Sequence, residues 1–128
     1  MNLATWVSLL VCNLLIPAAM IGFGLMLLKK PPKKINGLFG YRTSRSMKNQ
    51  DTWDFAQRYM GKVWWKWGWI MLSPVVFVQA LTLLCPDTNS MSIWAFVLMA
   101  AELVVLMASI SPVEWALKRN FDQDGNRI

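Results

Sequence analysis

The chain has 128 residues, of which 55% are hydrophobic and 16% are charged, and its formal net charge is +6. An ordinary soluble domain is about 45–50% apolar and about 25% charged, so these totals argue against a soluble globular protein. The length favours a single domain, and a chain with no histidine and two cysteines has no Cys/His zinc pattern.

The first predicted element is an uncharged apolar run at residues 3–28. A helix of this length, at about 1.5 Å per residue, exceeds the ~30 Å hydrocarbon layer and can cross it with some tilt. A cleaved signal peptide has a basic segment followed by an apolar core of about 7–15 residues. Because no Lys or Arg precedes Lys29 and the run is far longer, we expect a permanent membrane span.

A basic segment at residues 29–66 follows the first span. Its opening KKPPKK should end the helix, because proline lacks an amide donor and its ring clashes with the preceding turn. The Asn36-Gly37 pair and Gly40 then predict tight turns or a close backbone approach.

An amphipathic helix is predicted for the second half of this segment. Three side chains at its start can accept hydrogen bonds from free amides, namely Asn49, Asp51 and Thr52. Apolar residues then recur at three- and four-residue steps and form one stripe: Trp53, Ala56, Met60, Val63, Trp64 and Trp67. We expect this helix to lie at the inner membrane surface or to bend into the second span, with tryptophans at the headgroup level.

Two further apolar runs complete the predicted fold, at residues 67–84 and at residues 93–113. The first is uncharged, and the second contains one charged residue, Glu102. In lipid every backbone amide needs an internal partner, so each run should be a helix. The sequence therefore predicts an all-α membrane protein with three transmembrane helices and an amphipathic cytoplasmic helix before the second span. Cys12 and Cys85 fall at unequal depths, so we expect no disulfide between them.

The basic residues are concentrated on one side of the predicted spans. Ten Lys and Arg residues lie between the first two spans and three follow the third, whereas residues 85–92 contain Asp87 and no base. Positive loops stay in the cytoplasm, so we expect the N-terminus outside and the C-terminus inside. Clustered bases also bind nucleic acid. However, bases at the inner end of a span attract anionic lipid at about 1 kcal/mol each, and we favour that interpretation.

The stretch NGLFGYRTSRSMKNQDTW is unlike a plain linker. Arg42 presents a planar fork of donors that suits a carboxylate, a phosphate or carbonyl groups, and neighbouring side chains add hydroxyl and amide groups. One interpretation is an internal staple, in which Arg42 holds helix-end carbonyls or pairs with Asp51 or Asp54. The other interpretation is a binding site for an anionic group.

This stretch resembles the signature of the SdpI/YfhL family, small bacterial membrane proteins often described as immunity proteins. In that family an Asn, an aromatic-Gly-aromatic-Arg-Thr/Ser core, a Ser/Thr and a following Trp recur between two spans. The corresponding residues here are Asn36, Gly37, Phe39, Gly40, Tyr41, Arg42, Thr43, Ser46 and Trp53, followed by Ala56 and Gln57.

The resemblance implies a protein of the bacterial inner membrane that protects the producing cell from a secreted antimicrobial toxin. The best-known member also signals by holding a transcriptional repressor at the membrane, so a scaffold that sequesters a regulator is an alternative. That member carries extra spans beyond the three-span unit expected here. The expected partners are membrane lipids with anionic headgroups and either a peptide toxin or a cytoplasmic regulator, and a homo-oligomer is compatible with the small size.

Three polar side chains fall within the predicted spans: Asn13, Gln79 and Glu102. A carboxylate at mid-span costs about 2.5–3.5 kcal/mol on insertion scales, so it normally faces protein or water. Counted from the outer ends of the spans, Asn13 and Glu102 lie at similar depths and Gln79 is somewhat shallower, so the three could meet in one layer. Polar contacts between helices, typically about 0.6 kcal/mol each, are the simpler interpretation. A small ligand or ion site in a transporter or channel subunit is the alternative.

No pattern in the sequence predicts catalysis. The chain contains no histidine and no P-loop, Gly-x-Ser-x-Gly or dinucleotide fingerprint. Asp51 and Asp54 have an ordinary place at the start of a helix. The DQDG stretch at residues 122–125 resembles the start of a calcium loop but lacks its remaining ligands. We therefore expect neither an enzyme nor a cofactor or metal site.

Overall fold

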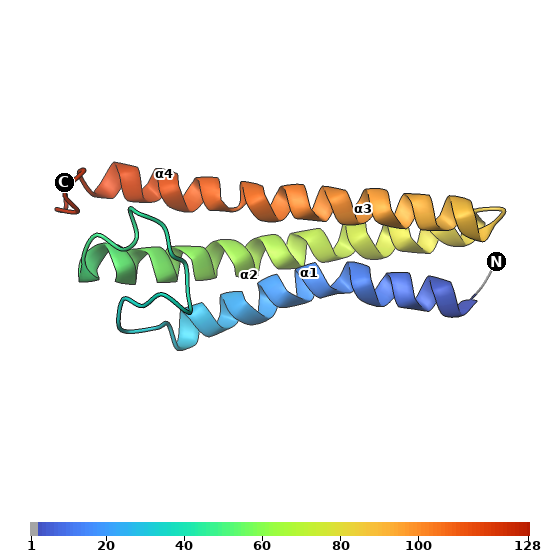
Figure 1. Cartoon of the computed structure of the whole chain (residues 1–128), viewed down its shortest axis with the longest axis horizontal. Helices are drawn as coiled ribbons and strands as arrows, with labels where there is room; N and C mark the ends of the chain where they lie inside the picture. The colour runs from blue at the N-terminus through green and yellow to red at the C-terminus, as the bar shows by residue number, and fades with distance from the viewer. Residues whose placement is uncertain (1–2) are drawn as a thin grey trace.

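The computed structural model describes residues 3–128, and within this range the protein is all-helical, with one isolated β-bridge in the C-terminal tail. Helices α1 (Leu3–Lys29), α2 (Gln50–Leu81) and α3 (Thr88–Ala108) are long, and α4 (Ile110–Asn120) continues the direction of α3 (Figure 1). A single 3-10 turn, η1 (Thr82–Leu84), extends the end of α2. Three described helical segments are long and apolar enough to cross a membrane, which confirms the predicted fold class.

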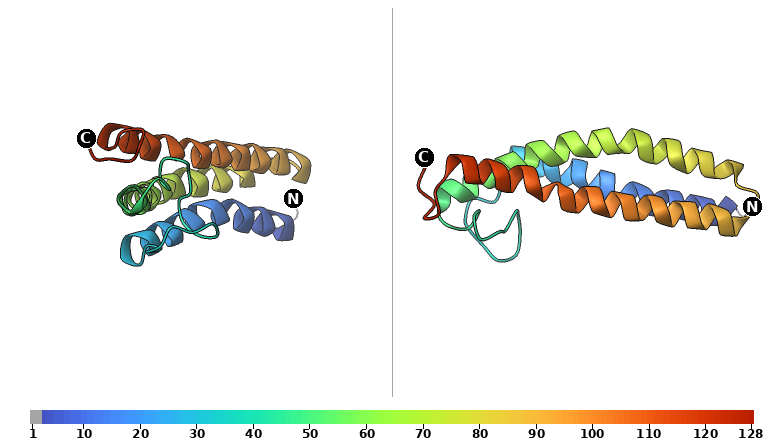
Figure 2. Two further views of the ribbon diagram at one scale, coloured as in Figure 1. Left: turned by 60° about the vertical axis from the view of Figure 1, so that its left-hand side comes forward. Right: turned by 90° about the horizontal axis from the view of Figure 1, so that it is seen from above.

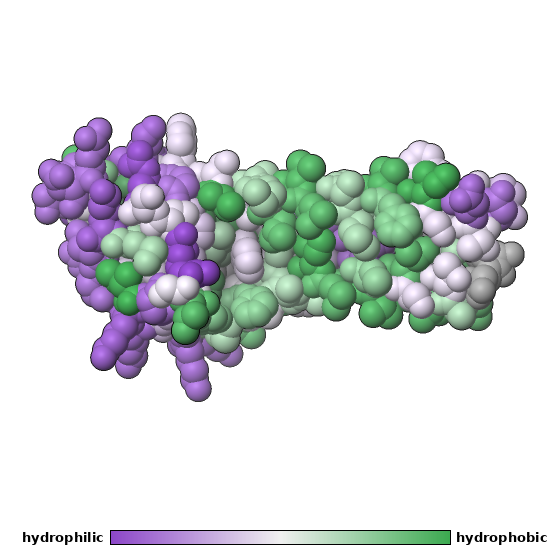
Figure 3. All heavy atoms as spheres, viewed as in Figure 1, coloured by the Kyte–Doolittle hydropathy of each residue, from purple (hydrophilic) through white to green (hydrophobic). Residues whose placement is uncertain are grey.

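The helices form an elongated bundle whose two ends differ in polarity. The start of α1 lies near the turn between α2 and α3, whereas residues 30–49 and the C-terminal tail lie together at the opposite end (Figure 1). The two further views show that α1 lies against both other rods (Figure 2), and α1 contacts both α2 and α3. Hydrophilic side chains gather at the end that holds the loop and the tail (Figure 3). We call this the polar end.

Glycines bring α1 and α2 into close contact. A Cβ atom added to Gly24 would lie 2.6 Å from the backbone nitrogen of Trp65, and one added to Gly61 would lie 3.0 Å from the carbonyl oxygen of Gly24. A Cβ atom added to Gly68 would lie 2.7 Å from the Cγ1 atom of Ile21 in α1. Small residues of this kind let two backbones approach in a membrane, where van der Waals packing supplies much of the attraction between helices.

The amphipathic segment and the second span are one continuous helix, which was one of the two arrangements expected. Asn49 caps α2, because its side chain accepts a hydrogen bond from the Thr52 amide at 2.9 Å. The Thr52 hydroxyl accepts in return from the Asn49 amide at 3.0 Å, which completes a capping box. The helix then runs through Pro74 without ending.

The third span begins earlier than the hydropathy predicts, at Thr88 instead of residue 93. The reason is a cap: the Asp87 carboxylate accepts from the Ser90 amide at 2.7 Å, and this hydrogen bond lowers the pKa of Asp87. The rod is interrupted at Ser109, between α3 and α4. Pro112 has no amide to donate to the carbonyl of Ala108, which explains the interruption.

Candidate binding site at the polar end

The connection between α1 and α2 is folded by its own side chains, beginning with Asn36. The Asn36 Oδ1 atom accepts from the amides of Leu38 and Phe39, at 2.9 and 2.8 Å, and its Nδ2 atom donates to the carbonyl of Lys34 at 2.9 Å. This turn leaves the Leu38 side chain 92% exposed. Asn36 therefore shapes the loop and presents an apolar side chain at its surface.

Gly40 lets the loop return to α2. Its φ of +103° lies in the region that favours glycine. A Cβ atom there would lie 2.7 Å from Gln57 Oε1 and 2.9 Å from Pro32 Cγ. Both the backbone angle and the space require glycine at this position.

Gln57 holds the backbone that follows. Its Oε1 atom accepts from the Tyr41 amide at 2.7 Å, and its Nε2 atom donates to the Tyr41 carbonyl at 2.8 Å. Gln57 is fully buried, so these two hydrogen bonds satisfy polar groups that water cannot reach. The sequence analysis did not place Gln57 in the site, although its match to the family signature was a signal that could have done so.

Tyr41 connects the loop to α4. Its hydroxyl donates to Glu114 Oε1 at 2.6 Å, and Glu114 Oε2 lies 3.7 Å from Arg45 Nε. Burial raises the pKa of Tyr41 far above its usual range, and the hydrogen bond to Glu114 and the negative charge of Glu114 add to this shift. The sequence analysis also missed Glu114. Its signal is an acidic residue that directly follows the third apolar run.

Thr43, Ser46 and Trp53 complete the fold of the motif. The Thr43 amide donates to Ser46 Oγ at 2.8 Å, and the Ser46 amide donates to Thr43 Oγ1 at 3.2 Å. The Trp53 indole donates to the carbonyl of Pro32 at 2.7 Å. Ser46 and Trp53 are fully buried, so in this structure both residues hold the loop in place and contact no solvent.

Arg42 differs from its neighbours because it is exposed. Its Nη1 atom donates to the carbonyl of Gly37. The ion pair in this region joins the other arginine of the loop, Arg45, to Glu114. Of the two contacts considered for an internal staple, residues 3–128 show no ion pair of Arg42 with Asp51 or Asp54, whereas Arg42 does hold a carbonyl, that of Gly37 in the loop and not one at a helix end. The guanidinium has further donors and is accessible to a ligand.

An apolar groove of about 450 Å³ lies beside Arg42. Phe39 and Arg42 line it from the loop, Phe23 from α1, Trp64 from α2 and Leu106 from α3. Arg42 is the one charged residue among its described lining residues. The groove therefore joins four helices and the motif, because Ile110 of α4 also lines it. Its chemistry suits an apolar molecule that also carries an anionic or carbonyl group.

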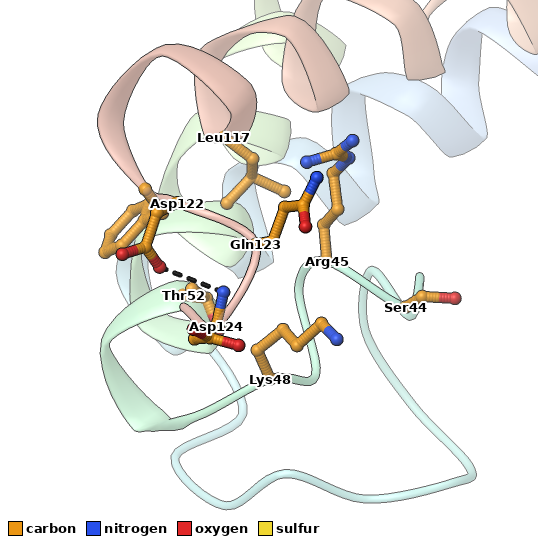
Figure 4. Close-up of a pocket in the computed structure, with 9 residues that line it drawn as sticks. Ser44, Arg45, Lys48, Thr52, Leu117, Asp122, Gln123 and Asp124 are labelled. Atoms are coloured by element: carbon orange, nitrogen blue, oxygen red, sulfur yellow. Dashed lines mark hydrogen bonds between the residues drawn. The ribbon is translucent and has the colours of Figure 1, made fainter. Parts of the chain in front are cut away.

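A second, polar cleft of about 480 Å³ separates the loop from the C-terminal tail (Figure 4). Arg45 and Lys48 line it from the loop. In the tail, the Asp122 carboxylate accepts from the amides of Asp124 and Asn126, each at 2.9 Å. Asp122 thus closes a tight turn, and within residues 3–128 no group of three potential acidic, Cys or His ligands is present.

The intramembrane polar residues lie toward the opposite end. Asn13 Nδ2 donates to Gln79 Oε1 at 2.9 Å and to the carbonyl of Ala95 at 3.3 Å, so these two side chains do meet. Glu102 lies two turns further along α3 than Ala95, about 10 Å at 1.5 Å per residue. Its carboxyl oxygens have no hydrogen-bond partner among residues 3–128. The expected three-residue layer is wrong for Glu102, because α3 starts earlier than predicted and places Glu102 deeper.

Comparison with known proteins identifies the family of this chain. The model of the SdpI/YfhL protein family matches residues 33–113, which include the whole motif and most of the two later rods. The chain belongs to the SdpI/YfhL protein family. It is also 50% identical over 40 residues to the uncharacterized protein YfhL of Bacillus subtilis (strain 168).

The alignment with YfhL covers only a part of this chain and a part of YfhL. The stretch aligned with YfhL covers 31% of this chain and 36% of that relative, so the chain matches about a third of YfhL. No solved structure matches the chain. Within the matched family range, the residues of the motif are the ones that bind the loop to α2 and α4 in this structure.

Proposed function

We propose that this SdpI/YfhL family member protects a bacterial membrane against a secreted, membrane-active peptide toxin. Membership of the family supports the proposal, because immunity is what the resemblance to that family implies. The observation that carries it is the polar-end groove: an apolar surface between four helices, with exposed Arg42 as the single charged residue among its described lining residues. A surface of this kind fits a ligand that is itself amphiphilic.

The mechanism under this proposal is binding. A membrane-active peptide carries apolar side chains that can enter the groove and backbone carbonyls or a carboxylate that can accept from Arg42. The hydrogen bonds of Gln57 to the Tyr41 backbone and of the Tyr41 hydroxyl to Glu114 hold the loop in position before the ligand arrives. A site that is already ordered pays less conformational entropy on binding.

The proposed orientation places the polar end in the cytoplasm. Twelve of the thirteen Lys and Arg side chains are exposed in the structure, all of them at or after Lys29. Anionic headgroups of the inner leaflet would attract these bases, at about 1 kcal/mol for each base near the surface. The toxin would therefore be met at the inner half of the bilayer, and the lipid headgroups would anchor the protein there.

Capture of a cytoplasmic regulator is a second candidate. Leu38 is 92% exposed and lies four residues before Arg42 on the same loop. An apolar side chain beside an exposed guanidinium is a combination that protein interfaces favour. This alternative uses the same loop, and the variants described next also separate it from toxin binding.

The test is protection of a sensitive bacterium that lacks a family member of its own. Cells producing the protein are challenged with a secreted peptide toxin of the class that SdpI-family proteins counter, and survival and membrane potential are followed. We expect wild type to preserve both. Arg42→Ala should lose most of the protection, because it removes the one charge of the groove, whereas Lys48→Ala, another exposed loop base outside the groove, should retain it.

Equal amounts of each variant in the membrane fraction are required for this comparison. Wild-type protein that is abundant in the membrane but leaves killing unchanged would contradict the immunity function. Protection that survives Arg42→Ala, with loss of a co-purifying cytoplasmic protein, would instead favour capture of a regulator.

A further inference from the structure

A separate pocket of about 350 Å³ lies between α2 and α3, within the apolar part of the bundle. Trp67, Met71 and Val75 line it from α2, and Ala101 and Glu102 line it from α3. Glu102 is the one ionisable or hydrogen-bonding side chain among the described lining residues apart from the Trp67 indole. The pocket shares no lining residue with the polar-end groove.

The Glu102 carboxyl group is buried without a partner. The residue is 2% exposed, and neither carboxyl oxygen makes a hydrogen bond to any residue in the described range 3–128. Asn13 Nδ2 donates to Gln79 Oε1 and not to Glu102, although Asn13 Oδ1 and Gln79 Nε2 are also buried without a partner among residues 3–128. Leaving a buried polar group unsatisfied costs about 1–3 kcal/mol, so a ligand that bonds to Glu102 would recover this cost.

The pocket is open toward the side of the bundle. Ile70, which lines it, is 62% exposed, and Ala101 is also exposed on the outer surface of α3. Both residues lie within segments long and apolar enough to cross a membrane. The approach to Glu102 is therefore through lipid, and a ligand that reaches it must have an apolar body.

We propose that this pocket binds lipophilic amines, apolar molecules that carry one basic nitrogen. The Glu102 carboxylic acid transfers its proton to the amine, and the resulting N–H⁺ group donates to the carboxylate. Such charge-assisted hydrogen bonds are roughly twice as strong as neutral ones. The Trp67 ring in the pocket wall adds a surface on which a cation is favourable. The proposal does not depend on the immunity function.

The experiment uses the whole protein in an uncharged detergent and a hydrophobic carbodiimide, N,N′-dicyclohexylcarbodiimide, as a reporter of the Glu102 carboxyl group. The carboxyl O–H adds across one C=N bond: oxygen bonds to the central carbon and the proton goes to nitrogen. The acyl group then shifts to nitrogen and gives a stable N-acylurea. No group leaves, so mass spectrometry detects the whole added reagent at one residue.

We expect labelling at Glu102 and its loss in Glu102→Gln. Glu114 is the internal control, because Tyr41 and Arg45 occupy its carboxylate. The probe ligand is N,N-dimethyldodecylamine, which should slow labelling at Glu102 about tenfold through its charge-assisted hydrogen bond. Dodecanol and dodecyltrimethylammonium have the same chain. The alcohol bonds only as a neutral group and the quaternary ion has no N–H, so each should protect less than the amine.

Two variants test the location of the amine. Ala101→Phe fills the pocket and should abolish protection by the amine, whereas Ala100→Phe, an exposed neighbour that does not line the pocket, should retain it. Thermal unfolding gives a readout without the reagent. The amine should raise the unfolding temperature of wild type and leave Glu102→Gln unchanged. If Ala101→Phe does not fold, the unfolding temperatures of wild type and Glu102→Gln test whether the amine binds at Glu102.

The proposal is overturned if Glu102 is not labelled in the folded protein. Equal protection by the amine and the quaternary ion, or protection that persists in folded Ala101→Phe, would also overturn it, because either would show that the chain alone is recognised or that the amine binds elsewhere. An unfolding temperature that the amine raises equally in wild type and Glu102→Gln leads to the same conclusion.

Discussion

Single side chains determine the path of residues 30–49, which contain no helix or strand of their own. A loop of this length has many amides and carbonyls that secondary structure does not pair. Asn36 and Gln57 pair several of them directly, and Gly40 gives the backbone the angle that makes the contact with Gln57 possible. The exposed position of Arg42 depends on these neighbours, since they fix the backbone on both sides of it.

The variant Gly40→Ala tests whether Gly40 is required for the path of this loop. An alanine at a φ of +103° is strained, and its Cβ would displace the Gln57 side chain, so we expect a cost of about 1–3 kcal/mol for the folded loop. Trypsin cleavage after Arg42 in detergent-solubilised protein should become about tenfold faster, because the loop opens more often. The matched control is Gly37→Ala, where a Cβ meets nothing within 4 Å and the rate should stay near that of wild type. Equal rates for the two variants would refute the role given to Gly40.

The pairing of α1 with α2 determines the geometry of the groove at the level of whole elements. The two helices meet where Gly24 and Gly61 allow their backbones to approach. Phe23 and Leu27 flank this contact on α1 and line the groove. A wider separation of the helices would therefore change the shape of the proposed binding site as well as the stability of the bundle.

Gly24→Ala should destabilise the bundle. The new Cβ would lie 2.6 Å from a backbone nitrogen of α2, which a side-chain rotation cannot relieve, and overpacking of this kind costs about 1–3 kcal/mol. Gly22→Ala on the same helix is the control, because a Cβ there meets nothing within 4 Å. Alanine favours a helix by about 0.5–1 kcal/mol over glycine, so that variant should be neutral or slightly more stable. Unfolding in mixed micelles with increasing dodecyl sulfate, followed by circular dichroism, measures both, and similar midpoints for the two variants would count against the close contact.

The distribution of charge over the whole molecule favours one orientation in the membrane. The loop and the C-terminal tail, which carry the basic residues, share the polar end (Figures 1 and 3). The opposite end carries the turn between α2 and α3, with Asp87 as a helix cap. Since positive segments remain in the cytoplasm, the turn is expected to face outward.

The protein's own cysteines can test this orientation. Both are free, Cys85 at the turn and Cys12 within α1. A maleimide that cannot cross membranes should label Cys85 in intact spheroplasts. Cys85→Ser should lose the label, because Cys12 lies within the apolar helix α1, which is long enough to cross the membrane. A cysteine introduced at exposed Ser44 in that background should react only after permeabilisation. Labelling of Ser44→Cys in intact spheroplasts would invert the proposed topology.

Much of the architecture could be predicted from the sequence because its causes are local. An uncharged run long enough to span lipid must pair its own backbone, so α1 and the two later rods follow from hydropathy alone. The prolines after Lys30 and the capping residues at Asn49 likewise indicate where one helix ends and the next begins. The family signature was also readable from residue types and spacing in the motif, and the family match confirms it.

The sequence by itself thus determined the class of the protein, the number of its membrane-crossing rods and the family to which it belongs. Only the tertiary structure decided that Tyr41 bonds to Glu114, 73 residues away, that Arg42 is exposed beside an apolar groove, and that Glu102 is buried without a partner among residues 3–128. Helical hydrogen bonds join residues four positions apart and leave their mark in the local pattern. The depth of one helix against another depends instead on caps and contacts between distant segments, and no local periodicity records those.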